Sequence, residues 1–375
     1  MRFSYIQKLS GDKMLVVAAL AALVIAVLLA PQSEIKFGRT DIVIAIPPEG
    51  IIREADFGTL IREFEAENKG IRVSIMENAD DSSKKGADVI IFDPLSPDGV
   101  DMFEDERLLV GGINPLFYNI SILQELGFDR PPKTRDDFLA VCRKIKGEGG
   151  AGSPVPFSFS RNVFHSVLPW FYQAGIDGLG LDEPLRIDWD SRAAKDAFAF
   201  LRVLIDEKLV ADGSLDRSED ALVDDFIVGR CAMMICPVSK IKKIDEANPS
   251  LRYGITTIPA PAGYKGRAVF NMSVLDVAMA KGSEHREEAV LFLEFIEGKR
   301  GDIAAATGMF SGNVGEMRNR APIFEKAADL YEASSLIDES KGLEAPLEQA
   351  ERMRDALMMG SGGGEAPAAL SEREG

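Results

Sequence analysis

Short apolar runs separated by turn residues predict several buried strands. Asp41–Ile46 is the first run, and the Pro-Pro-Glu-Gly sequence at 47–50 ends it. Ile71–Met76 and Ala87–Asp93 follow, with an amphipathic segment between the first run and the second. This strand-helix-strand order predicts a parallel α/β sheet. Further strands are predicted at Cys231–Cys236 and Tyr253–Pro259.

Four segments predict amphipathic helices, because their apolar residues recur three and four positions apart. The buried faces consist of Phe57, Leu60, Ile61 and Phe64; of Phe138, Val141, Cys142 and Ile145; of Ala194, Ala197, Phe198, Leu201 and Ile205; and of Ala289, Phe292, Leu293 and Ile296. Asp56, Thr134 and Ser283 are the predicted N-caps of the first, second and fourth helices.

The N-terminus carries an uninterrupted apolar run at residues 14–30, preceded by basic residues and closed by Pro31. As a helix it spans about 26 Å, enough for a thin bilayer or a signal-peptide core. The basic flank places the N-terminus in the cytoplasm and the rest of the chain outside. Leu28-Leu29-Ala30 before Pro31 is a poor cleavage site, which favours an uncleaved anchor over a removed signal peptide. A buried core helix is the third interpretation.

Composition narrows the function further. The length of 375 residues favours two lobes, and the net charge of −17 disfavours nucleic acid and anionic lipid as partners. Cys142, Cys231 and Cys236 lack the spacing of a zinc site, and a strand over 231–236 separates its two cysteines by roughly 16 Å. Three buried thiols are therefore expected, with no metal and no cofactor. The glycine-rich segment 360–375 is predicted to be a disordered tail.

Five motifs in order resemble the extracellular solute-binding proteins of ABC transporters, the group that includes maltose-binding protein. They are Asn114–Asn119 (NPLFYN), Pro131–Phe138 (PPKTRDDF), Phe226–Ile235 (FIVGRCAMMI), Tyr253–Pro259, and Lys281–Phe295. In the second motif Arg135 stands where the family usually has tryptophan. Each motif is weak alone, but their order and spacing cover roughly residues 40–350.

The resemblance implies a bacterial, two-lobed periplasmic-binding-protein fold of type II, whose chain crosses between lobes. Residues 1–37 would be the membrane segment and linker; 38–113 with 260–310 would form lobe one; and 114–259 with 311–359 would form lobe two. It also implies a monomer on the outer side of the cytoplasmic membrane that captures a small solute for the permease subunits of an ABC transporter. Lobe one is predicted to be shortened, because only about twenty residues separate Asp93 from Asn114.

The segment 157–172 is the predicted ligand contact from lobe two. It brings together Arg161, Asn162, Phe164, His165 and Trp170, which could stack on a polar solute and orient it. The alternative is that its aromatic residues, Trp170 included, form a helix face in the core. The loop after the Met-Met strand has no tryptophan, so carbohydrate specificity stays open at this point.

Five further residues are predicted to contact the solute. Phe270 and Asn271 lie where the chain returns to lobe one, although they could equally begin an ordinary strand. Pro48, Glu49 and Asp93 follow strands of lobe one and should rim the cleft.

Capture of a small polar solute, with a sugar or glycoside as one possibility, is the leading functional hypothesis. The alternative is a membrane-anchored sensor or scaffold derived from a solute-binding protein, which the shortened lobe one favours. An enzyme is disfavoured, because the chain has two histidines and no nucleophile or metal motif.

Overall fold

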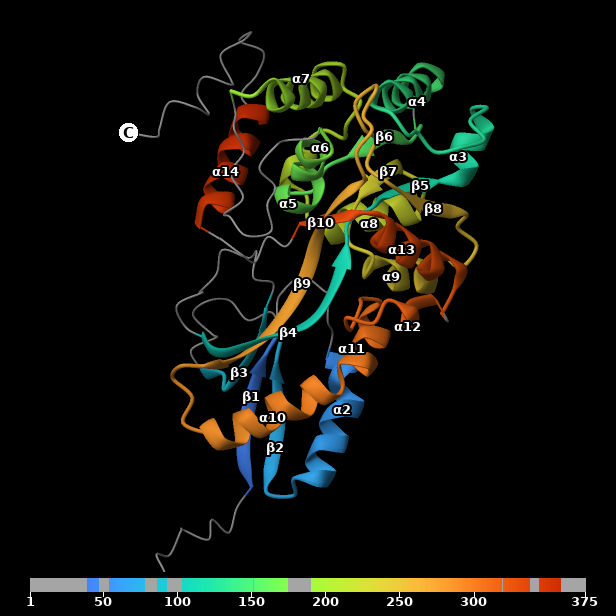
Figure 1. The fold of residues 1–375 in the computed structure, drawn as a ribbon. Coiled ribbons are helices and arrows are strands. Elements are labelled where there is room, and N and C mark those ends of the chain that lie inside the picture. Colours follow the sequence, from blue (N-terminus) through green and yellow to red (C-terminus); the bar gives the residue numbers. More distant parts are fainter. Residues whose placement is uncertain are drawn as a thin grey trace, which may run out of the picture. The chain divides into compact units, whose positions relative to one another are not determined.

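The computed structural model describes residues 39–46, 54–77, 86–92, 103–150, 152–174, 190–318, 320–337 and 344–358 (Figure 1). The chain divides into two units, 1–40 and 41–375, and the fold described below is that of the second. The predicted membrane segment at 14–30 and the tail at 360–375 lie outside the described residues. Within the described ranges, no helix has both the length and the apolar character needed to cross a bilayer.

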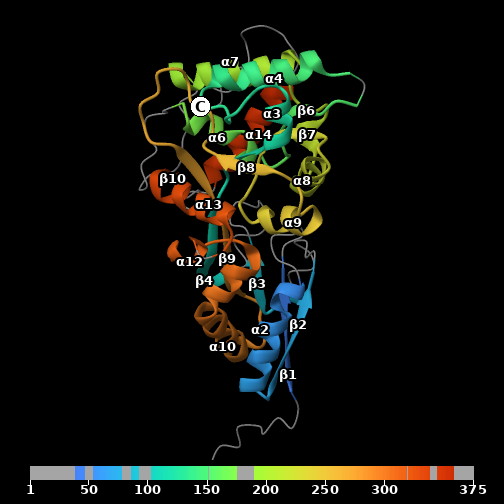
Figure 2. The ribbon, with the colours of Figure 1, turned by 90° about the vertical axis from the view of Figure 1, so that its right-hand side faces the viewer.

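A six-stranded sheet forms the first part of the fold. Its strands are β1 (Thr40–Ala45), β2 (Ile71–Met76), β3 (Val89–Phe92), β4 (Phe103–Ile113), β9 (Val269–Ala280) and β10 (Ser335–Ile337). The order is β10-β9-β3-β1-β2, with β4 also paired to β9. β1 and β3 are parallel, but β3 and β9 are antiparallel, so the sheet is mixed and not parallel throughout. The long strands β4 and β9 run side by side in both views (Figure 1 and Figure 2).

Helices α2 (Glu54–Glu67), α10 (Arg286–Gly298) and α11 (Arg300–Thr307) contribute apolar side chains to the core of this sheet. The rings of Phe64 and Phe292, from α2 and α10, meet edge to face with centroids 5.0 Å apart. Both rings are fully buried, as their helical periodicity predicted.

A four-stranded sheet forms the second part. Its strands are β5 (Leu116–Asn119), β6 (Val155–Ser158), β7 (Cys231–Ile235) and β8 (Tyr253–Thr256), in the order β6-β7-β5-β8. The other helices are α3 (Ile120–Glu125), α4 (Arg135–Glu148), α5 (Val163–Ser166), α6 (Leu168–Tyr172), α7 (Arg192–Asp206), α8 (Glu219–Ile227), α9 (Lys240–Ala247), α12 (Gly315–Arg318), α13 (Pro322–Ala333) and α14 (Glu344–Met358). α14 contacts α5 and α7, although it comes last in the chain (Figure 1).

Two of the predicted helix caps are wrong, and the third is confirmed. α2 begins at Glu54, so Asp56 lies inside the helix. The N-cap of α10 is His285; the Ser283 hydroxyl donates to a carboxylate oxygen of Asp88 at 2.7 Å and accepts from the His285 backbone N–H at 3.1 Å. Thr134 caps α4 with a complete capping box, in which the side chains of Thr134 and Asp137 each accept from the other's backbone N–H.

The three cysteines are free and buried, which confirms the prediction of buried thiols. Burial raises the pKa of Cys231 to about 12, and its thiol donates to the Met233 carbonyl oxygen. The pKa values of Cys142 and Cys236 are also raised, for the same reason. These thiols act as small apolar side chains of the core.

Candidate functional site

The candidate site lies at one edge of the four-stranded sheet. β6 and β7 are parallel, and β5 is antiparallel to β7 and β8. The carboxyl ends of β6, β7 and β8 therefore share an edge with the start of β5. In open α/β sheets, ligands bind beyond the carboxyl ends of strands. Buried polar side chains gather there from several segments: Asn114, Ser158, Ser160, His165, Ser166, Glu219, Ser239, Lys240, Asn271 and Ser273.

His165 is the centre of this polar cluster. It lies in the short helix α5, whose start is fixed by the Asn162 side chain accepting from the His165 backbone N–H. Its Nδ1 lies 2.5 Å from Oε1 of Glu219, and its Nε2 lies 3.0 Å from Oγ of Ser273. The ring is 1% exposed. Ser273 of β9 and Glu219, the first residue of α8, thus contact opposite nitrogens of the same imidazole.

Ser273 extends the cluster to the connection between β4 and β5. Its hydroxyl donates to Oδ1 of Asn114 at 2.7 Å, and Asn114 immediately follows β4. Two residues earlier on β9, Nδ2 of Asn271 donates to the Phe164 carbonyl oxygen at 2.6 Å. Both asparagines are fully buried.

Several buried polar atoms at this edge have no hydrogen-bond partner among the described residues. They include Nδ2 of Asn114, Oγ of Ser239 and Oδ1 of Asn271. A buried polar atom without a partner costs about 1–3 kcal/mol, so native proteins usually satisfy it with a ligand or an ordered water. The edge therefore offers both donors and acceptors to a small polar molecule.

The acidic member of the cluster is stabilised as a carboxylate. Burial would raise the pKa of Glu219, but the charge and hydrogen bond of His165 and the charge of Lys240 outweigh it and lower the pKa. Glu219 is also the first residue of α8, where the helix dipole favours a negative charge. Lys240 itself is 2% exposed and lies 3.1 Å from the Asp220 carboxylate.

The predicted contact residues of segment 157–172 fall into two groups. Asn162, Phe164 and His165 belong to the cluster or supply backbone to it, whereas Arg161 is exposed. Trp170 is fully buried and packs against the rings of Phe138 and Phe200, with centroids 5.0 and 5.1 Å away. Its ring belongs to the core, as the alternative stated above had it, and so offers no stacking face to a solute.

Of the remaining predicted contacts, Asn271 joins the cluster, and the adjacent Phe270 is a fully buried core residue. Both lie in β9. Pro48, Glu49 and Asp93 lie outside the described residues.

Sequence reasoning missed Asn114, Glu219 and Ser273 as members of the site. The sequence holds a signal for two of these three residues. Asn114 opens the NPLFYN motif, and Ser273 lies two positions after Asn271, on the same face of a strand. Glu219 gave no such signal, because an acidic residue after the Ser218 cap is typical of any helix start.

Arg135, which replaces the family's tryptophan, has a structural role. Its guanidinium is buried, donates to the Trp170 carbonyl oxygen at 2.5 Å and lies 5.0 Å from the centre of the Phe200 ring. Burial lowers its pKa to about 10. The guanidinium thus contacts Phe200, one of the two rings that pack against Trp170.

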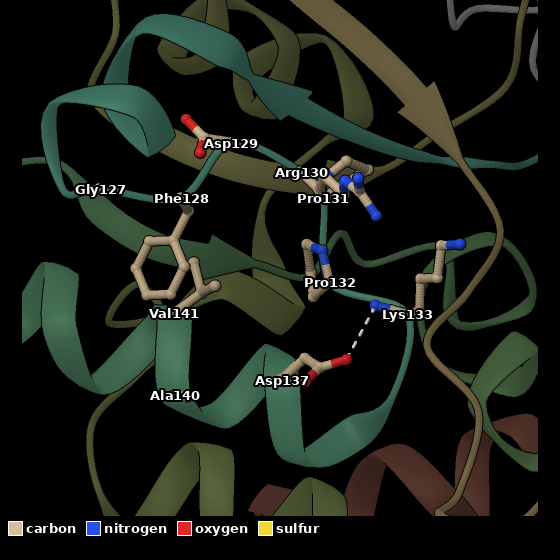
Figure 3. A pocket seen from close by; sticks show the side chains of 10 residues that line it. All are labelled: Gly127, Phe128, Asp129, Arg130, Pro131, Pro132, Lys133, Asp137, Ala140 and Val141. Atoms are coloured by element: carbon tan, nitrogen blue, oxygen red, sulfur yellow. Dashed lines mark hydrogen bonds between the residues drawn. The ribbon is translucent and has the colours of Figure 1, made fainter.

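A cavity of about 600 Å³ lies elsewhere, at the start of α4 (Figure 3). It is lined by residues 127–133 with Asp137, Ala140 and Val141, which include part of the PPKTRDDF motif. The Lys133 backbone N–H donates to Asp137 across its wall at 3.4 Å. None of its lining residues belongs to the polar cluster.

Comparison with solved structures identifies the fold as that of two-lobed periplasmic binding proteins. Mannotriose-bound CpMnBP1 matches with a TM-score of 0.68 and 16% identity, covering 88% of this chain and 98% of that protein. Maltose-bound MalE3 of T. maritima matches with a TM-score of 0.72 and 15% identity over the same shares. The raffinose complex of RafE gives a TM-score of 0.67 and 16% identity, over 88% and 97% of the two chains.

Curated relatives match over a shorter stretch. A binding protein of Brucella abortus (strain 2308) is 27% identical over 210 residues, which are 54% of this chain and 48% of that protein. A binding protein of Brucella suis biovar 1 (strain 1330) matches to the same extent. The match therefore spans about half the length of these relatives. The profile of the bacterial extracellular solute-binding proteins matches residues 52–303, more than half of the chain, and the chain belongs to this family.

Proposed function

We propose that this protein captures a small polar solute, in the first place a carbohydrate, outside the cytoplasmic membrane and delivers it to the permease subunits of an ABC transporter. The activity is reversible binding, without chemistry. The observation that carries the proposal is the pair of buried amide atoms, Nδ2 of Asn114 and Oδ1 of Asn271, at the sheet edge where this fold class binds ligands. Their needs are opposite, since one donates and the other accepts.

A sugar hydroxyl supplies both functions, because it carries one proton and two lone pairs. The structurally similar proteins bound to mannotriose, maltose and raffinose support this choice of solute class. Anchoring by residues 14–30 and a monomeric state are part of the same proposal.

The test is a thermal-shift and calorimetric screen of the fragment beginning at Gln32. The panel contains mannotriose, maltose and raffinose, with amino acids and glycerol phosphates as other classes. A ligand that binds only the folded state stabilises it by about 2.7 kcal/mol at a hundredfold excess over Kd. We expect a sugar to stabilise the wild type and to lose affinity in Asn271→Ala. Exposed Asn313 provides the matched control, Asn313→Ala, which should bind as the wild type does.

One observation favours the alternative, a membrane-anchored sensor or scaffold. Val238, in the loop after β7, packs against Gly112 of β4, and its backbone N–H donates to the Ile113 carbonyl oxygen at 3.0 Å. An apolar contact thus covers this part of the edge. A folded protein that none of the panel stabilises would contradict solute capture from that panel and direct the search to a protein partner.

A further inference from the structure

We propose that Glu219 holds His165 as an imidazolium and that His165 is a positioning residue, which determines the atom that Asn114 presents to the solute. The positioning role rests on the proposed function, because it needs a solute at this site. The charge of His165 is a property of the protein without solute.

The first step is the direction of the hydrogen bonds through Ser273. Its hydroxyl has one proton and lies within hydrogen-bond distance of both Asn114 and His165, at 2.7 and 3.0 Å. When Nε2 of His165 carries a proton, it donates a hydrogen bond to the Ser273 oxygen. The Ser273 hydroxyl then donates its own hydrogen bond to Oδ1 of Asn114. The atom left free on Asn114 is then Nδ2, a donor. This is the orientation in the structure.

The opposite direction requires an Nε2 without a proton. Ser273 would then donate to His165 and accept from the amide of Asn114, which would have to turn over. The free atom of Asn114 would become its carbonyl oxygen, an acceptor. Nδ2 of Asn271 is already fixed by donation to a backbone carbonyl oxygen, so Asn271 presents an acceptor in either case. Only a ring with a proton on Nε2 gives the site one donor and one acceptor.

The second step is what holds both ring protons. Nδ1 of His165 lies 2.5 Å from Glu219, and the side chains are 1% and 5% exposed. The amide nitrogen of Asn162 lies farther from the same Nδ1, at 3.0 Å, while the oxygen of that amide caps the backbone of His165. A buried carboxylate at this distance favours a proton on Nδ1, while the Ser273 oxygen accepts a hydrogen bond from the proton on Nε2.

Several charged groups in or next to α8, α9 and α14 pair with one another or act on Glu219. Lys240 of α9 acts on Glu219, and Asp220 of α8 is bound by Lys240 and Lys243 at 3.1 and 3.2 Å. Arg354 of α14 pairs with Asp216 at 2.5 Å, and Cys236 after β7 has a raised pKa and is a neutral thiol. The Glu219 carboxylate is therefore the counter-charge of the imidazolium.

The direct test is the ring ¹⁵N NMR spectrum of His165 at pH 7 without solute. The chain has two histidines, so His285→Gln leaves a single ring to observe. We expect both ring nitrogens to show imidazolium shifts. A neutral ring, in either tautomer, would overturn the proposal whether or not any solute binds.

The positioning role is tested by affinity for whichever panel sugar stabilises the wild type. His165→Gln retains an N–H donor near the position of Nε2, whereas His165→Asn is too short to reach Ser273. We expect about tenfold weaker binding in His165→Asn, equivalent to about 1.4 kcal/mol, and near wild-type binding in His165→Gln. Urea denaturation establishes that both variants fold.

Equal affinity in the two variants would refute the positioning role. If no panel sugar binds the wild type, the positioning role fails together with the proposed function, and the NMR result still decides the charge of His165. The two failures are thus distinguishable.

Discussion

Gly112→Ala should destabilise the protein through one defined contact. A Cβ at position 112 would lie 2.9 Å from Cγ2 of Val238, closer than carbon atoms approach in folded proteins. Val238 cannot easily move away, because it is fully buried and its backbone N–H is bonded to Ile113. Overpacking of this kind costs about 1–3 kcal/mol. The φ angle of Gly112 is not positive, so the cost is steric and does not come from backbone strain.

A double-mutant cycle isolates the contact. Val238→Ala removes two methyl groups from a buried site and should cost about 2 kcal/mol by itself. In that background Gly112→Ala should cost less than about 0.5 kcal/mol, because the clashing methyl group is gone. The assay is equilibrium urea denaturation, read from the midpoint at a constant m value.

Gly58→Ala is the matched control. Gly58 lies within α2, and the nearest atom to its added Cβ is a flexible Arg62 nitrogen at 3.7 Å. Alanine should therefore stabilise the helix by about 0.5–1 kcal/mol. A Gly112→Ala cost that is the same with and without Val238→Ala would refute the close approach of β4 to this loop.

Three further predictions concern buried residues. Trp170→Ala should lower the free energy of unfolding by about 3–5 kcal/mol, and Trp170→Phe by much less, in urea titrations, because the ring fills the core. The pKa of Glu219 is lower in the folded protein than its ordinary value of 4.5, so its carboxylate contributes stability at neutral pH that is lost as the pH falls through the folded-state pKa. Glu219→Gln lacks this carboxylate and should therefore lose less stability than the wild type below about pH 5 in the same titrations. A disulfide reagent should modify Cys142, Cys231 and Cys236 only after unfolding, because the raised pKa values and burial suppress the thiolates; rapid labelling of the folded protein would contradict this.

The strands that were predicted from the sequence are those whose own residues show a strand-like pattern of buried positions. β1, β3 and β7 are short apolar runs and β2 alternates buried and exposed residues; the observed bounds of these four strands differ from the predicted ones by at most two residues. β8 ends at Thr256, three residues before the predicted end at Pro259. β4 was not predicted, because its first half reads Phe-Glu-Asp-Glu-Arg and its pairing with β9 is irregular at two places. Such a strand is stabilised by pairing with a distant strand, and the local pattern of apolar residues carries no information about that pairing.

The candidate site divides in the same way. Asn162 and His165 were found because they lie together in one segment, but the partners of His165 lie 54 and 108 residues away, in α8 and β9. Local periodicity cannot show that residues so far apart in the sequence lie close together in the fold. Trp170 was ambiguous for a different reason. An aromatic residue at helical spacing is compatible both with a core position and with a surface that stacks on a ligand, and only the residues packed around it distinguish the two. Arg135 and the rings of Phe138 and Phe200 are those neighbours.

Gly112 and Ile113, the last two residues of β4, and Asn114, which follows them, each make a different contact. Gly112 allows the close approach of Val238, the Ile113 carbonyl oxygen accepts from Val238, and the Asn114 side chain accepts from Ser273. A side chain at 112 would displace the Val238 loop and, through the shared backbone bond, shift the carbonyl that precedes Asn114. The amide of Asn114 would then lose its alignment with Ser273, since hydrogen bonds weaken steeply away from linearity. Gly112→Ala should therefore weaken solute binding as well as stability, and Val238→Ala should restore both, because one contact underlies the two effects.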